Sequence, residues 1–365
     1  MDVWIGLMSG TSMDGIDAVL VSFDDQRLNT HGTHSLPYPD NLRQRLLAAC
    51  QNQATPDELG ELDTLTGLLF AEAANTVIDQ SGFARADICA IGSHGQTIRH
   101  QPSGPAPFSI QIGNPALIAE QTGIATVADF RRRDMAAGGE GAPLVPAFHQ
   151  FFFGSPTEDR CILNLGGIAN ITWLPANQSR PVTGFDTGPA NALMDAWCQA
   201  QTGRPFDQDG RWADEGVVDQ ALLNDLLSDA YFDRPAPKST GKEKFNLSWL
   251  KTALKRHPDI QPEDVQRTLL QLTVMSVARQ MPQSPTLCIY ACGGGTRNTL
   301  LMSELKQALS PARLSDTSEI GLDAQWVEPT AFSWLARQTI SGKPGNLPAV
   351  TGARGPRILG AIYPA

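Results

Sequence analysis

Several common sequence signals are absent from this chain of 365 residues, and each absence excludes a class of protein. The six cysteines are scattered, with no C-x-x-C pair and no Cys/His cluster at zinc spacing, which excludes a zinc finger or a thioredoxin-like motif. No Walker A pattern occurs, so the chain is not a P-loop protein. No G-x-G-x-x-G motif follows a predicted strand, so the usual dinucleotide-binding signature is missing as well.

Basic charge and long apolar runs are also lacking. The chain has 28 lysines and arginines against 38 aspartates and glutamates, and the resulting net charge of −10 argues against nucleic acid as a partner. No apolar run reaches the ~20 residues that a membrane span needs. The first residues show neither the basic start nor the apolar core of a signal peptide. We therefore expect a cytoplasmic protein with reduced cysteines and no membrane contact.

The residues that are present indicate an α/β protein. Hydrophobic residues make up 41% of the chain and charged residues 18%, as in an ordinary globular protein. Apolar periodicity predicts strands at 4–8, 16–23, 88–93, 108–112, 124–127, 160–165, 168–174 and 285–291. The same reasoning predicts helices at 41–50, 56–79, 115–121, 145–153, 189–201, 214–227, 262–281, 296–309 and 329–339. Strands that alternate with helices in this way are typical of α/β folds.

The most informative stretch is the predicted hairpin WIGLMSGTSMDGIDAVLVSF, residues 4–23. Gly10 and Gly15 allow the backbone of its turn to approach a ligand closely. The hydroxyls of Ser9, Thr11 and Ser12 and converging backbone N–H groups are suited to a phosphate anion. The alternative is a surface turn that only solvates itself.

The same pattern recurs at 160–174, where two predicted strands flank Gly166-Gly167. A repeat on this scale suggests a duplicated architecture with one phosphate hairpin in each half. The glycine-rich segment at 138–141 marks the predicted boundary. We expect domain I to contain 1–135 with the C-terminal segment 341–365, and domain II to contain 136–340.

Six blocks make the sequence recognisable. The chain resembles the anhydro-N-acetylmuramic acid kinases from its first strand to its last helix, and the blocks are long and chemically unusual. They are GLMSGTSMDGID at 6–17, SHGQT at 93–97, ADFRRRD at 128–134, GAPLVP at 141–146, NLGGIANIT at 164–172 and GFDTGPAN at 184–191.

The resemblance implies a fold and a reaction. The fold would be that of the actin-like ATPases: duplicated ribonuclease H-like domains with a deep interdomain cleft. Members of the family use ATP and water to open the 1,6-anhydro ring of anhydro-N-acetylmuramic acid, giving N-acetylmuramic acid 6-phosphate and ADP in cell-wall recycling. An alternative within the same superfamily is an ordinary sugar kinase acting on a free hydroxyl. The implied partners are the small anhydro-amino sugar and ATP, and a homodimer is a candidate assembly.

The resemblance also implies where ATP binds. Magnesium would be held mainly by the nucleotide and water, with no dedicated set of protein ligands. Asp14 and Asp17 are candidates to order that water, although a turn aspartate and a strand-edge aspartate account for them equally well. The implied ATP-binding residues are Gly10, Thr11, Ser12, Met13, Asp14, Gly15, Ile16 and Asp17 in the first hairpin, Asn164, Gly166, Gly167 and Asn170 in the second, and Gly293, Gly294, Gly295 and Thr296 beside the adenosine.

Asp186 is the predicted catalytic base. Ring opening requires one carboxylate that takes a proton from the attacking water. The alternative for Asp186 is a helix-capping role, because Pro189 opens a predicted helix and aspartate is a good capping residue. Gly188 can occupy that cap instead, and the resemblance favours the base.

The predicted sugar-binding residues are more dispersed. His94 is expected at an exposed strand end, although a structural histidine bonded to a backbone carbonyl is the alternative. Arg131 is preferred over Arg132 and Arg133 as the partner of the lactyl carboxylate, against the alternative of a solvated charge run. Glu328 is followed by Pro329, where the family pattern has small residues. The 238–242 loop is either a flexible surface loop or a wall of the site. The full predicted set is His94, Gln96, Arg131, Asp134, Phe185 and Glu328.

Overall fold

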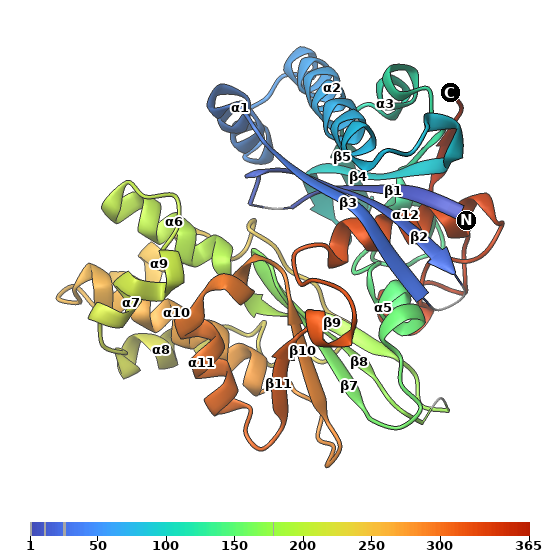
Figure 1. Cartoon of the computed structure of the whole chain (residues 1–365). Helices are drawn as coiled ribbons and strands as arrows, with labels where there is room; N and C mark the ends of the chain where they lie inside the picture. Colours follow the sequence, from blue (N-terminus) through green and yellow to red (C-terminus); the bar gives the residue numbers. More distant parts are fainter. Residues whose placement is uncertain (1, 11, 25–26, 178) are drawn as a thin grey trace. The chain divides into compact units, whose positions relative to one another are not determined.

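The computed structural model describes residues 2–10, 12–24, 27–177 and 179–365, and the chain divides into two compact units (Figure 1). Unit 1 comprises Met1–Phe153 and Trp326–Ala365, and unit 2 comprises Gly154–Gln325. These limits correct the predicted boundaries at 136 and 340. The glycine-rich segment does not separate domains, because it is bonded within unit 1: the Glu140 N–H donates to Thr351 O at 2.7 Å, and the Arg354 N–H donates to Ala137 O at 2.9 Å.

The sheet of unit 1 combines an antiparallel meander with parallel strands. The first strand lies at its centre, antiparallel to the second and parallel to the fourth. The order is β12-β6-β4-β1-β2-β3, with β5 paired to β4 off this path. The strands are β1 (Asp2–Ser9), β2 (Gly15–Asp24), β3 (Arg27–Pro37), β4 (Ile88–Gln101), β5 (Phe108–Ile112), β6 (Thr126–Ala128) and β12 (Ala361–Tyr363).

The sheet of unit 2 repeats this plan. Its order is β11-β10-β7-β8-β9, in which β7, β8 and β9 form the meander and β10 and β11 are parallel to β7. Its strands are β7 (Arg160–Leu165), β8 (Ile168–Leu174), β9 (Thr183–Pro189), β10 (Cys288–Cys292) and β11 (Arg313–Asp316). The core order β6-β4-β1-β2-β3 therefore matches β11-β10-β7-β8-β9 strand for strand. This match confirms the α/β class and the duplicated architecture that the repeated hairpin predicted.

Helices cover both faces of the sheet of unit 1. Ile5 and Leu7 of β1 pack with the apolar face of α2, whereas Gly6, which points the opposite way, faces α12. A capping box formed by Thr55 and Glu58 starts α2, and Gly82 ends it in the left-handed conformation. The helices are α1 (Asp40–Cys50), α2 (Pro56–Ser81), α3 (Pro115–Thr122), α4 (Phe130–Ala136), α5 (Pro146–Phe153), α12 (Val327–Ile340) and α13 (Pro348–Thr351), with the 3₁₀ turn η1 (Arg85–Asp87).

The helices of unit 2 surround a second core that includes Leu163, Leu269 and Leu305. The single helix predicted at 214–227 is wrong: Gly216 has extended backbone packed on Glu263, and Asp219 caps a new helix. The helix predicted from 296 begins at Thr299 instead, capped by Asn298. The elements are α6 (Asn191–Thr202), α7 (Arg211–Glu215), α8 (Gln220–Leu227), α9 (Leu247–Leu254), α10 (Pro262–Ala278) and α11 (Thr299–Ala308), with the 3₁₀ turns η2 (Gln208–Gly210), η3 (Gly294–Arg297) and η4 (Thr317–Ile320).

Two further properties bear on function. Among the helices that the structure describes, none combines the length and apolar character needed to cross a membrane. Each of the six cysteines is a free thiol.

Candidate functional site

The first predicted phosphate hairpin is the turn between β1 and β2 in unit 1. The Met13 N–H donates to Gly10 O at 3.2 Å, and Met13 has a φ of 58°. A Cβ added at Gly10 would have only Ser12 Oγ nearby, at 3.8 Å, whereas one at Gly15 would overlap Leu36 O. Gly10 therefore leaves room for a ligand, and Gly15 is required by the sheet. Thr11, also predicted to bind ATP, lies outside the described residues.

The remaining residues of this hairpin differ in what they can offer. The Met13 and Ile16 side chains are buried in the core, so only their backbone can face a ligand. The Asp14 side chain is 73% exposed and lies 3.5 Å from the Arg43 guanidinium. Asp17 accepts a hydrogen bond from Ser35 Oγ on the neighbouring strand. Both carboxylates thus lie beside the turn, although neither belongs to a preformed cage: the described residues contain no group of three potential metal-binding side chains.

Gln96 on β4 supports the turn of this hairpin by a hydrogen bond to Gly10. Its side chain is fully buried on β4, and its Nε2 donates to Gly10 O at 3.3 Å. Ser9 Oγ lies 2.7 Å from Gln96 Oε1 and 2.7 Å from Gly15 O, so it joins both ends of the turn to β4. The prediction placed Gln96 in the sugar pocket. Its burial and these contacts show that it supports the turn of the predicted phosphate hairpin, and its contact with the sugar stays a prediction.

The buried His94 is paired with the half-buried Arg131. The expected exposed strand end is wrong, because β4 continues to Gln101 and His94 is only 5% exposed. His94 Nδ1 lies 2.7 Å from Gly95 O, and Arg131 Nη2 lies 2.8 Å from His94 Nε2. Burial, and secondarily the Arg131 charge, lowers the pKa of His94 to about 3. The ring is therefore neutral, with Nδ1–H donating to Gly95 and Nε2 accepting from Arg131.

Asp134 belongs to a buried network. It has no exposed surface, and its carboxylate accepts hydrogen bonds from the Gly141 N–H at 2.9 Å, from Asn346 at 2.7 Å and from Thr351 at 2.8 Å. These contacts join α4, the glycine-rich segment and the C-terminal segment. Asp134 is therefore better placed to hold Arg131 and its helix than to contact a sugar.

The other candidates of unit 1 are more exposed. Arg131 Nη1 donates to Gly141 O at 2.8 Å, whereas Arg132 and Arg133 lie at the surface. Glu328 is half-buried in the first turn of α12, which Pro329 does not interrupt. Arg131 is thus held by two hydrogen bonds, whereas the more exposed Arg132 forms an ion pair with Asp129 at 3.4 Å.

In unit 2, three polar side chains form a row across the meander. Asn164 on β7 is the register partner of Asn170 on β8, and Asn170 is the register partner of Asp186 on β9. Partners of this kind place their side chains on the same face of a sheet. The predicted base and the second phosphate hairpin, separated in sequence, are therefore brought together.

The glycine segment after β10 lies at the end of this row. Cys292 is the register partner of Asn164, and Gly293 follows with a φ of 83°. A side chain at Gly293 would overlap Asn164 Oδ1, and a Cβ at Gly295 would lie 2.7 Å from Leu165 Cβ. Both glycines are needed for packing.

Gly294 and Thr296 behave differently. Gly294 is exposed and has nothing within 4 Å of an added Cβ, so its backbone is accessible to a ligand. The Thr296 hydroxyl donates to Gly293 O at 2.8 Å and closes the turn.

In the second predicted phosphate hairpin, the carbonyls of Gly166 and Gly167 accept hydrogen bonds from N–H groups at the start of α6, including that of Asn191 at 3.2 Å.

Asp186 lies inside β9 and does not cap a helix. The capping alternative is excluded because α6 begins at Asn191, after Ala190. The Asp186 carboxylate accepts a hydrogen bond from the Thr240 N–H at 2.9 Å. Phe185, the preceding residue, is half-buried and packs against the core of unit 2. Alternation along the strand thus gives the two neighbours opposite roles.

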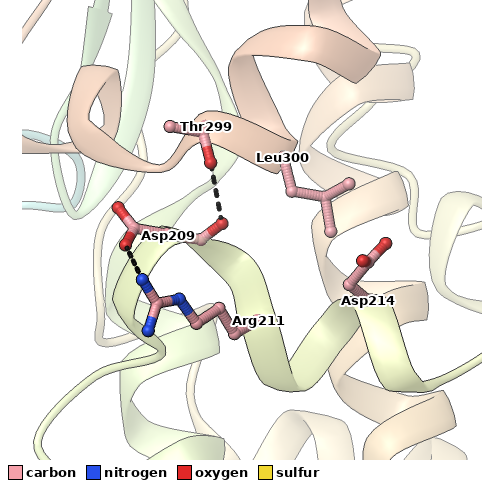
Figure 2. Close-up of a pocket in the computed structure, with 5 residues that line it drawn as sticks. All are labelled: Asp209, Arg211, Asp214, Thr299 and Leu300. Atoms are coloured by element: carbon pink, nitrogen blue, oxygen red, sulfur yellow. Dashed lines mark hydrogen bonds and ion pairs between the residues drawn. The ribbon is translucent and has the colours of Figure 1, made fainter.

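A pocket of about 480 Å³ in unit 2 lies at the first turn of α11. Figure 2 shows its lining residues, among them Asp209 and Arg211, which form an ion pair at 3.3 Å. Thr299, at the start of α11, donates its hydroxyl to Asp209 O at 3.2 Å. Asp214 and Leu300 complete the wall, which therefore combines carboxylates with an apolar surface.

Comparison with known proteins decides the family. The model of a family described as anhydro-N-acetylmuramic acid kinase matches residues 2–365. The chain belongs to the anhydro-N-acetylmuramic acid kinase family. The kinase of that name from Shewanella halifaxensis is 50% identical over 364 residues, covering 99% of this chain and 98% of that protein. The one from Xanthomonas campestris pv. campestris is 51% identical over 370 residues, covering 100% and 97%.

These relatives support the predicted kinase family and not the alternative, an ordinary sugar kinase acting on a free hydroxyl. Among solved structures, component A of (R)-2-hydroxyglutaryl-CoA dehydratase from Acidaminococcus fermentans is 8% identical, with a TM-score of 0.48 over 91% of this chain and 96% of that one. So distant a likeness adds nothing to the assignment of the site.

Proposed function

We propose that this chain catalyses the reaction implied by its family: ATP-dependent opening of the 1,6-anhydro ring of anhydro-N-acetylmuramic acid, with phosphorylation of O6. Water attacks C1 and gives up a proton to the Asp186 carboxylate. The C1–O6 bond breaks, and O6 attacks the γ-phosphoryl group, releasing ADP. Attack opposite the departing oxygen resembles inverting glycoside cleavage, except that the phosphoryl group captures the oxygen.

The row Asn164–Asn170–Asp186 carries this proposal. The Asp186 carboxylate lies on β9, the strand next to β8 of a hairpin whose amides and backbone suit a phosphate. The carboxylate is half-exposed and held by the Thr240 N–H, so it can face a substrate in a fixed orientation. A single base is sufficient if the phosphoryl group replaces the usual acid.

Both hairpins are proposed to bind the phosphates of ATP. In the first, the accessible backbone at Gly10 and the exposed Asp14 fit a magnesium–nucleotide complex, in which carboxylates order the water around Mg²⁺. In unit 2, accessible Gly294 fits close approach by the nucleoside. The pocket at Asp209 begins just beyond the same turn, and its carboxylates could accept hydrogen bonds from ribose hydroxyls.

The lactyl carboxylate of the sugar is assigned to Arg131. His94 and Gly141 orient its guanidinium through two hydrogen bonds, and a planar fork of donors matches a carboxylate. Because His94 stays neutral, it adds no charge of its own to the site. Glu328 remains a prediction as a sugar contact.

The experiment is to incubate the purified chain with anhydro-N-acetylmuramic acid and ATP in oxygen-18 water. We expect the label at C1 of a 6-phosphorylated product. Unlabelled C1 in a phosphorylated product would favour transfer to a free hydroxyl and overturn the ring-opening reaction. We also infer a cytoplasmic location, where ATP is supplied, and sedimentation velocity would test the predicted homodimer.

A further inference from the structure

At Asp186, a neighbouring segment of the chain covers the edge of the sheet in unit 2. Because β9 is an edge strand, one side of its backbone lacks a neighbouring strand. The segment 231–240 takes that place: the Asp186 N–H donates to Lys238 O at 3.2 Å, and the Tyr231 hydroxyl donates to Asp186 O at 2.7 Å. The Thr240 N–H then binds the carboxylate itself. The segment thus fixes both backbone groups and the side chain of the proposed base.

Lys238 anchors this segment from within. Its side chain is only 2% exposed, and its Nζ donates to Tyr231 O at 3.2 Å and to Phe232 O at 3.3 Å. The ammonium also lies 4.8 Å from the centre of the Tyr231 ring and 5.7 Å from that of Phe185. Its two carbonyl partners and the ring faces offset part of the cost of burying a charge.

The charges around Lys238 are mixed. Burial lowers the pKa of Lys238 and nearby Arg234 lowers it further, whereas Asp233 and Asp186 oppose this shift. Asp186 therefore interacts with a cation that has very little contact with water. That cation is held in place by the same turn that supplies the Tyr231 hydroxyl.

We propose that Lys238 is a positioning residue for Asp186. Its buried ammonium holds the carbonyls of Tyr231 and Phe232 by hydrogen bonds, and the segment that is fixed in this way orients the Asp186 carboxylate. The inference rests on the proposed role of Asp186 as the base. It assigns a task to the 238–242 loop that neither a flexible surface loop nor a passive wall would have.

The decisive variant is Lys238→Met. Methionine keeps the length of the side chain but leaves the Tyr231 and Phe232 carbonyls without their donor, so we expect some loss of stability and assay the variant where it is fully folded. We expect kcat to fall about 10- to 100-fold, because displacing a catalytic group by about 1 Å can lower the rate by up to about 10²-fold. The KM for ATP and the affinity for ADP measured by calorimetry should change little, whereas the melting temperature should fall. Lys255→Met, at the exposed end of α9, is the matched control and should behave as wild type.

A second variant covers the possibility that Lys238→Met does not fold. Tyr231→Phe removes only the hydroxyl that donates to Asp186 O, and we expect it to lower kcat with the KM for ATP unchanged. Its matched control is Tyr290→Phe on β10, which removes a hydroxyl that lies 3.4 Å from Glu158.

The outcomes separate the two proposals. If the wild type phosphorylates the sugar with labelled C1 while folded Lys238→Met and Tyr231→Phe keep its kcat within about twofold, the positioning role is overturned and the function stands. If the wild type does not perform the reaction at all, the proposed function fails. A kcat loss confined to the two variants, with both controls active, supports the positioning role.

Discussion

Gly6 and Gly92 are register partners on the adjacent parallel strands β1 and β4, and the backbone of α12 packs directly against both of them. A Cβ at Gly6 would overlap Pro329 O, and one at Gly92 would overlap Phe332 O. The helix backbone therefore rests directly on the sheet, which only glycine allows. Because α12 carries Glu328 in its first turn, this packing contact also sets the position of a proposed sugar contact.

We expect Gly6→Ala to destabilise unit 1 by about 1–3 kcal/mol or more, because overpacking forces the helix backbone away from the sheet. Urea unfolding followed by fluorescence measures the change. Gly60→Ala is the control: this exposed helical glycine in α2 has nothing within 4 Å of an added Cβ, and the substitution should stabilise by roughly 0.5–1 kcal/mol. Equal stability of Gly6→Ala and wild type would contradict this close packing of α12 on Gly6.

Local signals in the sequence were sufficient for the hairpins and for the duplication. The apolar runs around Gly10 and Gly166 predicted the first two strands of each sheet, and the repeat predicted the duplicated architecture that the matching strand orders show. The same signals failed for β9, because Gly184, Gly188 and Pro189 give its strand the composition of a loop. Asp186 therefore looked like a possible helix cap until the register with Asn170 placed it in the sheet.

The interactions that orient the site could not have been predicted from local sequence. The burial of His94 depends on β4 continuing beyond the predicted strand, and its bond to Arg131 joins distant segments. Gln96 and Ser9 meet for the same reason, through the pairing of β1 with β4. The domain boundary was misplaced because a glycine-rich segment suggests a linker, whereas here the buried Asp134 fastens it to unit 1.

Gly294 provides a test of the adenosine assignment. Its Cβ position is open, so we expect Gly294→Val to leave stability nearly unchanged and to raise the KM for ATP at least about tenfold, because a side chain would occupy space used by the nucleotide. Steady-state kinetics with varied ATP measures this. Gly295→Ala is the counterpart, because its Cβ would press on Leu165, and it should lower the melting temperature instead. An unchanged KM for Gly294→Val would place the nucleoside elsewhere.

Three histidines of unit 1 should make its stability depend on pH. Burial is the first cause that lowers the pKa of His94, His100 and His149 to about 3, against about 6.5 in an unfolded chain. Between these values the unfolded state binds more protons than the folded state, so stability falls as pH falls. We expect the titration of each histidine to lower the free energy of unfolding by about 1.3 kcal/mol as the pH falls from 7 to about 5.5. Urea unfolding across this range measures the slope.

His149→Phe isolates one of these contributions. His149 packs among Phe148 and Phe153 on α5 and is 2% exposed, so an aromatic ring without a titrating group suits the site. The variant should lose about one third of the histidine-dependent change in stability over this range. If its pH slope equals that of wild type, His149 does not titrate as proposed.

Asp186→Asn tests the coupling of the two chemical steps. The amide keeps the shape of the side chain and can still accept from the Thr240 N–H, but it cannot take a proton from water. We expect sugar hydrolysis and phosphorylation to be lost together, by at least about 10³-fold, because O6 becomes a nucleophile only when C1–O6 breaks. Product analysis by mass spectrometry and calorimetric titration with ADP measure the two activities and the nucleotide affinity.

Asn170→Ala is the informative companion, because it changes the neighbour of Asp186 without removing the base. It should weaken phosphate binding and raise the KM for ATP, whereas Asp186→Asn should bind ADP as wild type does. An Asp186→Asn enzyme that still opened the ring but no longer transferred phosphate, or the reverse, would break the coupled mechanism. The base would then have to be sought among other carboxylates, while the family and the fold would stand.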